Sequence, residues 1–334
     1  MQTVKEEKLD IEVLKVSSPI LPQRAWQIES FLLKIFEYGD YSFRKALAGR
    51  LSSHLQCTFF IAQNNGCILA AAGSLYSMDN PAVAILGPVC VDPQHRRQGV
   101  AARACEFLLS HIKAQGTKAV YLGVRQDGPA VGLYRKLGFD NYRGIVMRRL
   151  FVSRHEFDKR YSPVQATIIR KMDWRDFAEI AALLCKSAKV HSFDFCRQVF
   201  SAKYTTIERF LPVFPDMMKS LEKNGGFANI LATDQTQSIV GIAHINIQPS
   251  KLQNHIAVLD FFVLDGFIDK ARELVSETLK QSGLNSNWIV ICYCPNCDNQ
   301  KKQILLSLGA KQYSTLPGFI KIHNKPEDVI ILRL

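Results

Sequence analysis

Residues 91–102 read VDPQHRRQGVAA and lie between a short apolar run and a long amphipathic segment. The run 82–91 is almost wholly apolar, which favours a buried strand. After it, small or apolar side chains recur at helical spacing, at Ala101, Ala104, Cys105, Leu108, Leu109 and Ile112. The stretch is therefore predicted to turn from a strand into a helix, with Gly99 in the first helical turn.

This turn has the composition of an anion-binding cradle. The start of a helix presents free backbone N–H groups and the positive end of the helix dipole. Gly99 has no Cβ to obstruct a ligand, and Arg96 and Arg97 add positive charge suited to phosphates. The spacing fits neither of the two common Gly-rich phosphate loops. An ordinary helix start flanked by a solvated arginine pair is the alternative interpretation.

Two motifs carry a resemblance to a known family. Arg96-x-x-Gly99-x-Ala101 resembles the Q/R-x-x-G-x-G/A acyl-CoA signature of the GNAT superfamily of N-acetyltransferases. Residues 127–139, DGPAVGLYRKLGF, resemble the later motif of the superfamily, with its N-x-P-A start and L-Y-x-K/R-x-G-F end. Residues 118–125 read as a strand between the two motifs, so the order of elements also matches. The resemblance covers roughly residues 9–151.

The resemblance implies acetyl-CoA as co-substrate and no metal ion. In the superfamily the cradle holds the pyrophosphate, and the main chain of the preceding strand pairs with the pantetheine arm. The implied cofactor-binding residues are Val89, Cys90, Val91, Arg96, Arg97, Gln98, Gly99, Val100, Ala101, Ala102, Asp127 and Ala130. Asp127 departs from the usual Asn and, when ionised, cannot donate a hydrogen bond. Capping of the next helix is an equal alternative for Asp127.

The implied reaction is transfer of an acetyl or short acyl group to a primary amine by direct attack in a ternary complex. Tyr134 is the candidate general acid, because a phenol beside the sulfur can donate a proton to the leaving thiolate. A packed aromatic on a helix is the alternative for Tyr134. Cys90 as a nucleophile is disfavoured, since the superfamily transfers directly to the acceptor. A catalytically inactive CoA-binding sensor or scaffold is the alternative function.

The sequence offers several candidates for the group that deprotonates the amine. Many family members place a Glu on the strand that here is 82–91, which has no acidic residue. Water or residues of other segments are the alternatives, with Asp40, Tyr41, Tyr76 and Asp79 as candidates. Each is more simply interpreted as a surface or turn residue. His95 neighbours the cradle and is expected to line phosphate.

The whole chain is predicted to be an α/β protein with two tandem domains, each a mostly antiparallel mixed sheet flanked by helices. Residues 1–152 would form the acyl-CoA-binding domain, and the polar stretch 153–163 a linker. Residues 164–334 would form a degenerate GNAT-like domain. In the first half, strands are expected at 9–16, 57–62, 67–76, 82–91, 118–125 and 142–151, and helices at 22–36, 43–54, from 98 and at 129–137.

The second half repeats this plan without its chemistry. Strands are expected at 164–170, 227–233, 239–247, 256–264 and 288–293, and helices at 174–187, 193–221, 268–281 and 300–308. The turn 265–270 has no Arg-x-x-Gly-x-Ala, and its Asp265 and Asp269 would repel a pyrophosphate. Aligning Leu308-Gly309 with Leu137-Gly138 puts Leu305 at the place of Tyr134. Three cysteines at 292–297 are interpreted as a strand end, because zinc needs four ligands.

Composition limits the classes of protein to which this chain can belong. The 334 residues are 47% hydrophobic and carry a net charge of +12, with 19 Lys and Arg against 12 Asp and Glu in residues 1–150. Because the excess is spread over both halves, it favours no nucleic-acid surface. No apolar run reaches the length of a membrane span, no secretory signal is apparent, and nine cysteines suggest reduced thiols. We expect a cytoplasmic protein, a small-molecule or peptide amine as partner, and no nucleic acid or membrane, with a homodimer as one candidate assembly.

Overall fold

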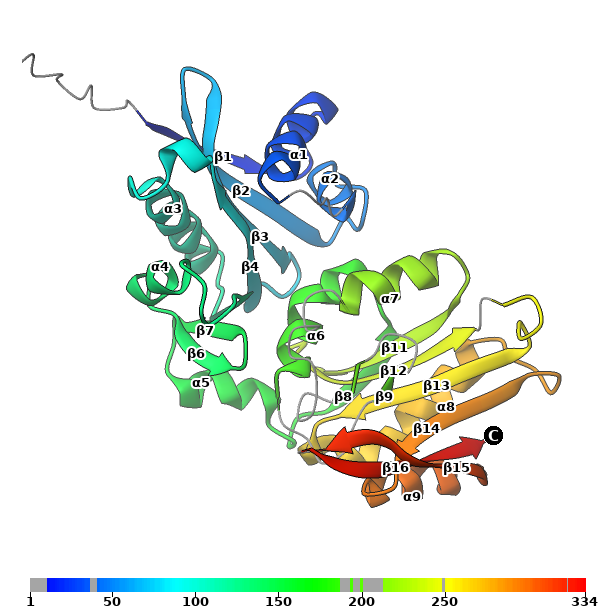
Figure 1. Ribbon diagram of the computed structural model, residues 1–334. Helices are drawn as coiled ribbons and strands as arrows, with labels where there is room; N and C mark the ends of the chain where they lie inside the picture. Colours follow the sequence, from blue (N-terminus) through cyan, green and yellow to red (C-terminus); the bar gives the residue numbers. More distant parts are fainter. Residues whose placement is uncertain are drawn as a thin grey trace, which may run out of the picture. The chain divides into compact units, whose positions relative to one another are not determined.

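The computed structural model describes residues 11–36, 41–186, 193–194, 199–200, 213–247, 250–322 and 324–334. The chain divides into two compact units. Unit 1 comprises Met1–Tyr142 and Met147–Val152, and unit 2 comprises Arg143–Val146 and Ser153–Leu334. Each unit holds a seven-stranded mixed sheet with helices around it (Figure 1). The predicted α/β fold with two tandem sheet-and-helix layouts is confirmed.

The sheet of unit 1 has the strand order β1-β2-β3-β4-β5-β7-β6. Its strands are β1 (Glu12–Ser17), β2 (Leu55–Asn64), β3 (Cys67–Ser77), β4 (Val83–Val91), β5 (Ala119–Gly123), β6 (Asp140–Arg143) and β7 (Val146–Leu150). β1 through β4 pair antiparallel, whereas β4 and β5 pair parallel. Asn65 and Gly66 both have positive φ, which is the conformation that a two-residue hairpin between β2 and β3 requires.

Helices cover both faces of this sheet (Figure 1). They are α1 (Pro22–Phe36), α2 (Tyr41–Leu47), the 3-10 turn η1 (Pro93–His95), α3 (Val100–Ala114) and α4 (Val131–Lys136). One apolar cluster joins Ala104 and Leu108 of α3 and Tyr134 of α4 to Phe60 and Leu86 of the sheet. The core thus fixes α3 and α4 against the strands that flank the predicted cradle.

The sheet of unit 2 has the order β15-β16-β14-β13-β12-β11-β8, with β13 and β14 parallel. Its strands are β8 (Thr167–Lys171), β11 (Gly226–Thr233), β12 (Ile239–Ile247), β13 (Ile256–Val263), β14 (Ile289–Pro295), β15 (Lys311–Ile322) and β16 (Lys325–Arg333). A separate two-stranded sheet pairs β9 (Phe193–Asp194) with β10 (Val199–Phe200). The helices are η3 (Trp174–Asp176), α6 (Phe177–Leu184), α7 (Val213–Glu222), η5 (Asp265–Lys270), α8 (Ala271–Gln281) and α9 (Asn299–Ser307).

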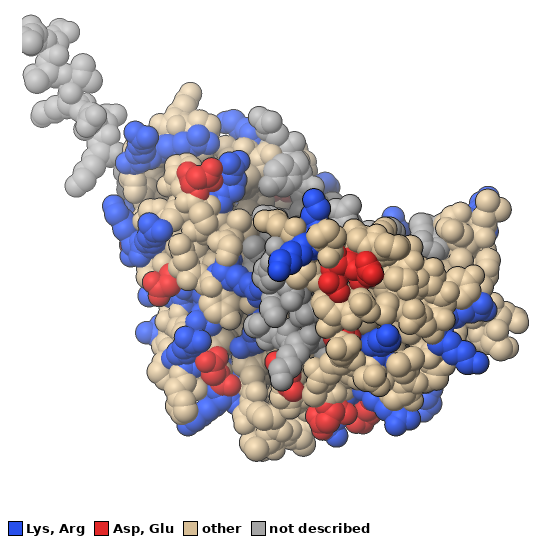
Figure 2. All heavy atoms as spheres, turned by 60° about the horizontal axis from the view of Figure 1, so that its bottom comes forward, with Lys and Arg blue, Asp and Glu red and all other residues tan. Residues whose placement is uncertain are grey.

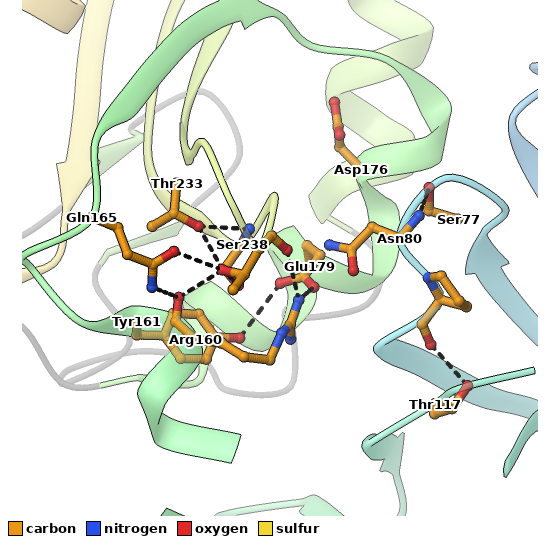
Figure 3. A network of polar contacts seen from close by, with 12 residues as sticks. Ser77, Asn80, Thr117, Arg160, Tyr161, Gln165, Asp176, Glu179, Thr233 and Ser238 are labelled. Carbon is orange, nitrogen blue, oxygen red and sulfur yellow. Dashed lines mark hydrogen bonds and ion pairs between the residues drawn. The ribbon is translucent and has the colours of Figure 1, made fainter. Parts of the chain in front are cut away.

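The stretch 153–163, expected as a polar linker, is instead largely helical and clusters with unit 2. It holds α5 (Arg154–Asp158) and η2 (Lys159–Tyr161). Arg160 is buried and forms an ion pair with Glu179 of α6 (Figure 3). Its carbonyl also accepts a 3.0 Å hydrogen bond from the Thr236 hydroxyl in the β11–β12 turn. The charged side chain of Arg160, which lies in a polar stretch of the sequence, is therefore buried and holds residues 153–163 against the rest of unit 2.

Three other expectations differ from the structure. Residues 142–151 form not one strand but the ends of β6 and all of β7, which turn at Gly144 with φ 52°. The range 193–221, expected to be mostly helical, contains β9, β10 and α7, while 195–198 and 201–212 lie outside the described residues. The helix expected at 43–54 ends earlier, since α2 stops at Leu47 and Gly49 has φ 67°. The β15–β16 hairpin had no counterpart in the sequence analysis.

The surface and the helices agree with the bulk composition. On the face drawn in Figure 2, Lys and Arg are spread out with Asp and Glu among them. Among the helices that the structure describes, none combines the length and the apolar character needed to span a bilayer.

Candidate active site

The predicted cradle is a turn with two left-handed residues before α3. Arg97 has φ 62°, and Gly99, the N-cap of α3, has φ 77°. No side chain caps the first turn of α3, so its backbone N–H groups remain available, from Val100 through Ala102. A Cβ built on Gly99 would meet no atom within 4 Å. The concave side of the turn is therefore open and rich in backbone donors, which fits a phosphate group.

Contacts behind the turn hold its shape. The Asp92 carboxylate accepts a 3.0 Å hydrogen bond from the backbone N–H of Gln94 and lies 3.1 Å from Lys34 Nζ of α1. The Gln94 bond and then the Lys34 contacts lower the pKa of Asp92. The Gln98 side chain donates to the Gln94 carbonyl at 3.3 Å and closes the turn. Because these contacts lie at the base of the turn, Arg96 and Arg97 remain exposed.

The strand before the turn diverges from its parallel neighbour. β4 pairs with β5 only at Val83–Ile85, opposite Ala119–Tyr121. Beyond Ile85, β4 continues through Val89, Cys90 and Val91, which pair with β3 on their other side. A register shift between Ala72 and Ser74 of β3 lies opposite Gly87 and Pro88 of β4. The edge of β4 from Leu86 to Val91 that faces β5 thus leaves main-chain groups unpaired by β5.

Cys90 does not have the character of a nucleophile. Its side chain is buried, and burial raises the pKa of the thiol to about 12. At neutral pH it is therefore a thiol and not the reactive thiolate. This agrees with a main-chain role for residues 89–91.

Tyr134 lies on α4, in the same apolar cluster as Leu86 of β4. The side chain is 8% exposed and contacts Phe139 edge-on, with ring centroids 5.9 Å apart. Burial, and then the electrostatic influence of Cys105 on α3 and Cys90 on β4, raise the pKa of its phenol. No hydrogen bond joins the Tyr134 hydroxyl to any described residue. The phenol of Tyr134 is therefore protonated at neutral pH, and its O–H can donate a hydrogen bond.

Asp127 and Ala130 lie at the approach to α4. Asp127 is exposed and forms an ion pair with Arg125, with Arg125 Nη2 3.0 Å from Asp127 Oδ2. Arg125 lowers the pKa of Asp127. The N-cap of α4 is Ala130, and no side chain caps it, so the capping role weighed for Asp127 is wrong.

The candidate bases are not gathered at β4. Tyr76 is 4% exposed, and its hydroxyl is hydrogen-bonded to Thr58. Asp79 lies 2.8 Å from the ring of His54 in an exposed pair. Asp40 and the side chain of Tyr41 lie outside the described residues. β4 itself, VAILGPVCV, contains no acidic residue.

Two further observations complete the site. Among the described residues, no group of three or more His, Cys, Asp or Glu side chains is placed to hold a metal ion. Arg149 of β7 donates to the carbonyl of Leu137 at the end of α4. Sequence reasoning missed Arg149, Lys34 and the Gly87-Pro88 irregularity, because each acts across strands or helices distant in the chain.

Comparison with known proteins follows this geometry. Residues 23–139 match the family model described as the acetyltransferase (GNAT) family. Unit 1 therefore contains a GNAT acetyltransferase domain. No curated protein matches the chain.

Solved structures resemble about half of the chain. A GNAT-family acetyltransferase from Streptococcus pneumoniae is 16% identical, with 51% of this chain and 99% of that chain covered and a TM-score of 0.40. The ribosomal-protein-S18-alanine N-acetyltransferase from Escherichia coli is 21% identical, with coverage of 42% and 96% and a TM-score of 0.34. Mutant forms of the spermidine/spermine N-acetyltransferase SpeG from Vibrio cholerae are 14% identical, with coverage of 50% and 92% and a TM-score of 0.38.

Proposed function

We propose that unit 1 transfers an acetyl or other short acyl group from acetyl-CoA to a primary amine. The observation that carries this proposal is Tyr134, a buried phenol on α4 within electrostatic reach of Cys90 on β4. Its hydroxyl makes no hydrogen bond with the described residues. In this proposal residues 1–152 form the acyl-CoA-binding domain, and 164–334 a degenerate GNAT-like domain.

The donor is held by main-chain groups. The open left-handed turn at Arg97 and Gly99 would bind the pyrophosphate, with Arg96 or Arg97 adding charge. The free edge of β4 at Val89 to Val91 would pair with the amide groups of the pantetheine arm. Acetyl-CoA supplies the activated thioester. The protein supplies orientation, which is a large part of the acceleration of such reactions.

The transfer step uses one proton donor. The amine nitrogen attacks the thioester carbonyl carbon, the carbon–sulfur bond breaks, and the sulfur leaves with the bonding electrons. The Tyr134 O–H gives the sulfur a proton or a hydrogen bond. β4 has no carboxylate to take the proton that the amine loses, so water or a residue of another segment takes it.

A CoA-binding sensor or scaffold without turnover is the second candidate function. The specific observation in its favour is the missing carboxylate on β4. Tyr134 weakens this alternative, because a scaffold has no need of a hydroxyl group that can donate a proton.

The test is release of free thiol from acetyl-CoA with a panel of amines, for the wild type and Tyr134→Phe, beside calorimetry with CoA. Amine-dependent release that falls sharply in the variant while CoA affinity is kept would support the acetyltransferase. CoA binding without turnover on any amine would favour the sensor or scaffold. A partial control is Tyr142→Phe, because Tyr142 packs edge-on against Tyr121, with ring centroids 5.8 Å apart.

A further inference from the structure

Each unit contains one pair of parallel strands that separates after three residue pairs. In unit 1 the last pair is Ile85 with Tyr121. In unit 2 the last pair is Val258 with Ile291, although β13 continues to Val263 and β14 to Pro295. Beyond Ile291, β14 pairs on its other side with β16. We call the space between β13 and β14 beyond this last pair the wedge of unit 2.

Two charged side chains meet in the wedge of unit 2. Asp260 lies two residues beyond Val258 on β13, and its side chain is 1% exposed. Lys301 of α9 forms an ion pair with it and is fully buried. Burial alone would lower the pKa of Lys301, but Asp260, and then Cys292 and Cys294 of β14, raise it. The Lys301 ammonium thus pairs with Asp260 of β13 and is influenced electrostatically by Cys292 and Cys294 of β14.

The same two positions in unit 1 carry the smallest side chains. Helices α4 and α9 both end at a leucine followed by a left-handed glycine, Gly138 with φ 79° and Gly309 with φ 91°. Seven residues before these leucines stand Ala130 in unit 1 and Lys301 in unit 2. Two residues beyond the last strand pair, Gly87 corresponds to Asp260. A Cβ built on Gly87 would meet no atom within 4 Å, so this place is open in unit 1.

Unit 2 also lacks the other features that keep the cradle of unit 1 open. The pairing of β12 with β13 shows no register shift, unlike that of β3 with β4. In place of the open glycine, η5 leads into α8 with Asp265 in its first turn. A Cβ on Gly266 in this turn would lie 3.3 Å from Pro163, so the proline covers it.

We propose that the Lys301–Asp260 ion pair plugs the place in unit 2 that corresponds to the acyl-donor cleft of unit 1, so that the chain binds one acyl-CoA. This inference rests on the proposed function of unit 1, because that function defines the cleft. Unit 2 is then a copy of the fold in which the internal ion pair occupies the position that the ligand would take in unit 1. An unpaired charge in this buried position would destabilise the fold, so neither residue could fill the place without the other.

The first test is calorimetric titration of the full chain with CoA, for the wild type and Gly99→Val. One equivalent for the wild type and none for Gly99→Val is the expected result. A second equivalent, or an equivalent that survives Gly99→Val, would overturn the plug. If neither protein binds CoA, the proposed function of unit 1 is overturned, whereas the closure of unit 2 is not contradicted. The two failures are therefore distinguishable.

The second test opens the plug chemically. Lys301→Ala removes a propylammonium-sized group and leaves Asp260 buried without this partner. We expect a lower thermal midpoint that millimolar n-propylammonium chloride raises towards that of the wild type, with no gain from n-propanol or tetramethylammonium chloride. A variant as stable as the wild type, or one that n-propylammonium does not raise, would overturn the plug.

A third variant covers the case in which Lys301→Ala fails to fold. Lys301→Met with Asp260→Leu replaces the pair by apolar groups of similar length and leaves no unpaired charge. We expect this protein to fold and to bind one equivalent of CoA, because Met and Leu still fill the wedge. Binding of a second equivalent would show that a filled wedge still accepts the donor, and would overturn the plug. Loss of the single equivalent while the protein stays folded would place the donor site in unit 2 and overturn it.

Discussion

Arg149 Nη1 donates a 2.7 Å hydrogen bond to the carbonyl oxygen of Leu137, and so joins β7 to the last turn of α4. A guanidinium at this place stabilises the negative end of the helix dipole as well as a terminal carbonyl. Burial lowers the pKa of Arg149, yet the side chain remains a cation at any ordinary pH. The residue behind the carboxyl end of α4 thereby positions the helix that carries Tyr134.

Replacement of Arg149 by Met is expected to destabilise unit 1 by about 1.5–3 kcal/mol, the usual contribution of one hydrogen bond to a charged group. We also expect a fall in kcat with little change in CoA affinity, because α4 moves and the cradle does not. Urea unfolding, steady-state kinetics and calorimetry measure the three quantities. Arg135→Met, an exposed change on the same helix, is the control and should leave all three unchanged.

Gly99→Ala should weaken CoA binding by about tenfold or more, since a residue with a Cβ is strained at φ 77° and fills the open side of the turn. Gly116→Ala is the matched control, because Gly116 has φ 93° just beyond the other end of α3. Both variants carry a similar backbone penalty, so they should lose similar stability. Equal losses of CoA affinity in the two proteins would contradict a cradle at Gly99.

The pH dependence of turnover should show no loss from ionisation of Tyr134. A general acid works only while protonated, and burial raises the pKa of Tyr134 above its ordinary value of 10. Because the pKa is raised, the active protonated form persists to higher pH than that of a free phenol would. We expect kcat to rise with amine deprotonation and to show no decline up to about pH 10. A decline with a midpoint below 10 that disappears in Tyr134→Phe would refute this assignment.

Arg160→Met should destabilise unit 2 by about 3–5 kcal/mol, because it leaves Glu179 buried without its ion-pair partner. Arg160→Met combined with Glu179→Leu should recover most of the loss. The control is Arg154→Met, whose ion pair with Asp158 is largely exposed and contributes little. Urea unfolding of the full chain measures all three variants. If Arg154→Met costs as much as Arg160→Met, the segment 153–163 is no anchor.

The local part of the site could be predicted from the sequence. Gly99 and Tyr134 belong to motifs whose spacing within one turn or helix already determines their geometry. The positions of the sheet strands were also predictable where apolar runs are bounded by turn residues, as at Asn65 and Gly66.

Long-range partners could not be predicted in this way. Arg160 and Lys301 read as solvated charges, because nothing within several residues of either one shows that a carboxylate on a distant element will meet it. The short strands β9 and β10 lie in a range whose composition suits a helix, and their pairing outweighs that propensity. Capping by Asp127 failed for a similar reason, since Arg125 pairs with it instead.

The acid-free strand β4 has a consequence for which amines can react. In the proposed reaction with water as the base, the amine arrives neutral, and its own pKa sets the neutral fraction. At pH 7.5 about one third of a peptide α-amine is neutral, compared with about one part in a thousand of a lysine side chain. The proposed reaction would therefore favour weakly basic amines over strongly basic ones by roughly two orders of magnitude before any contact with the acceptor is made.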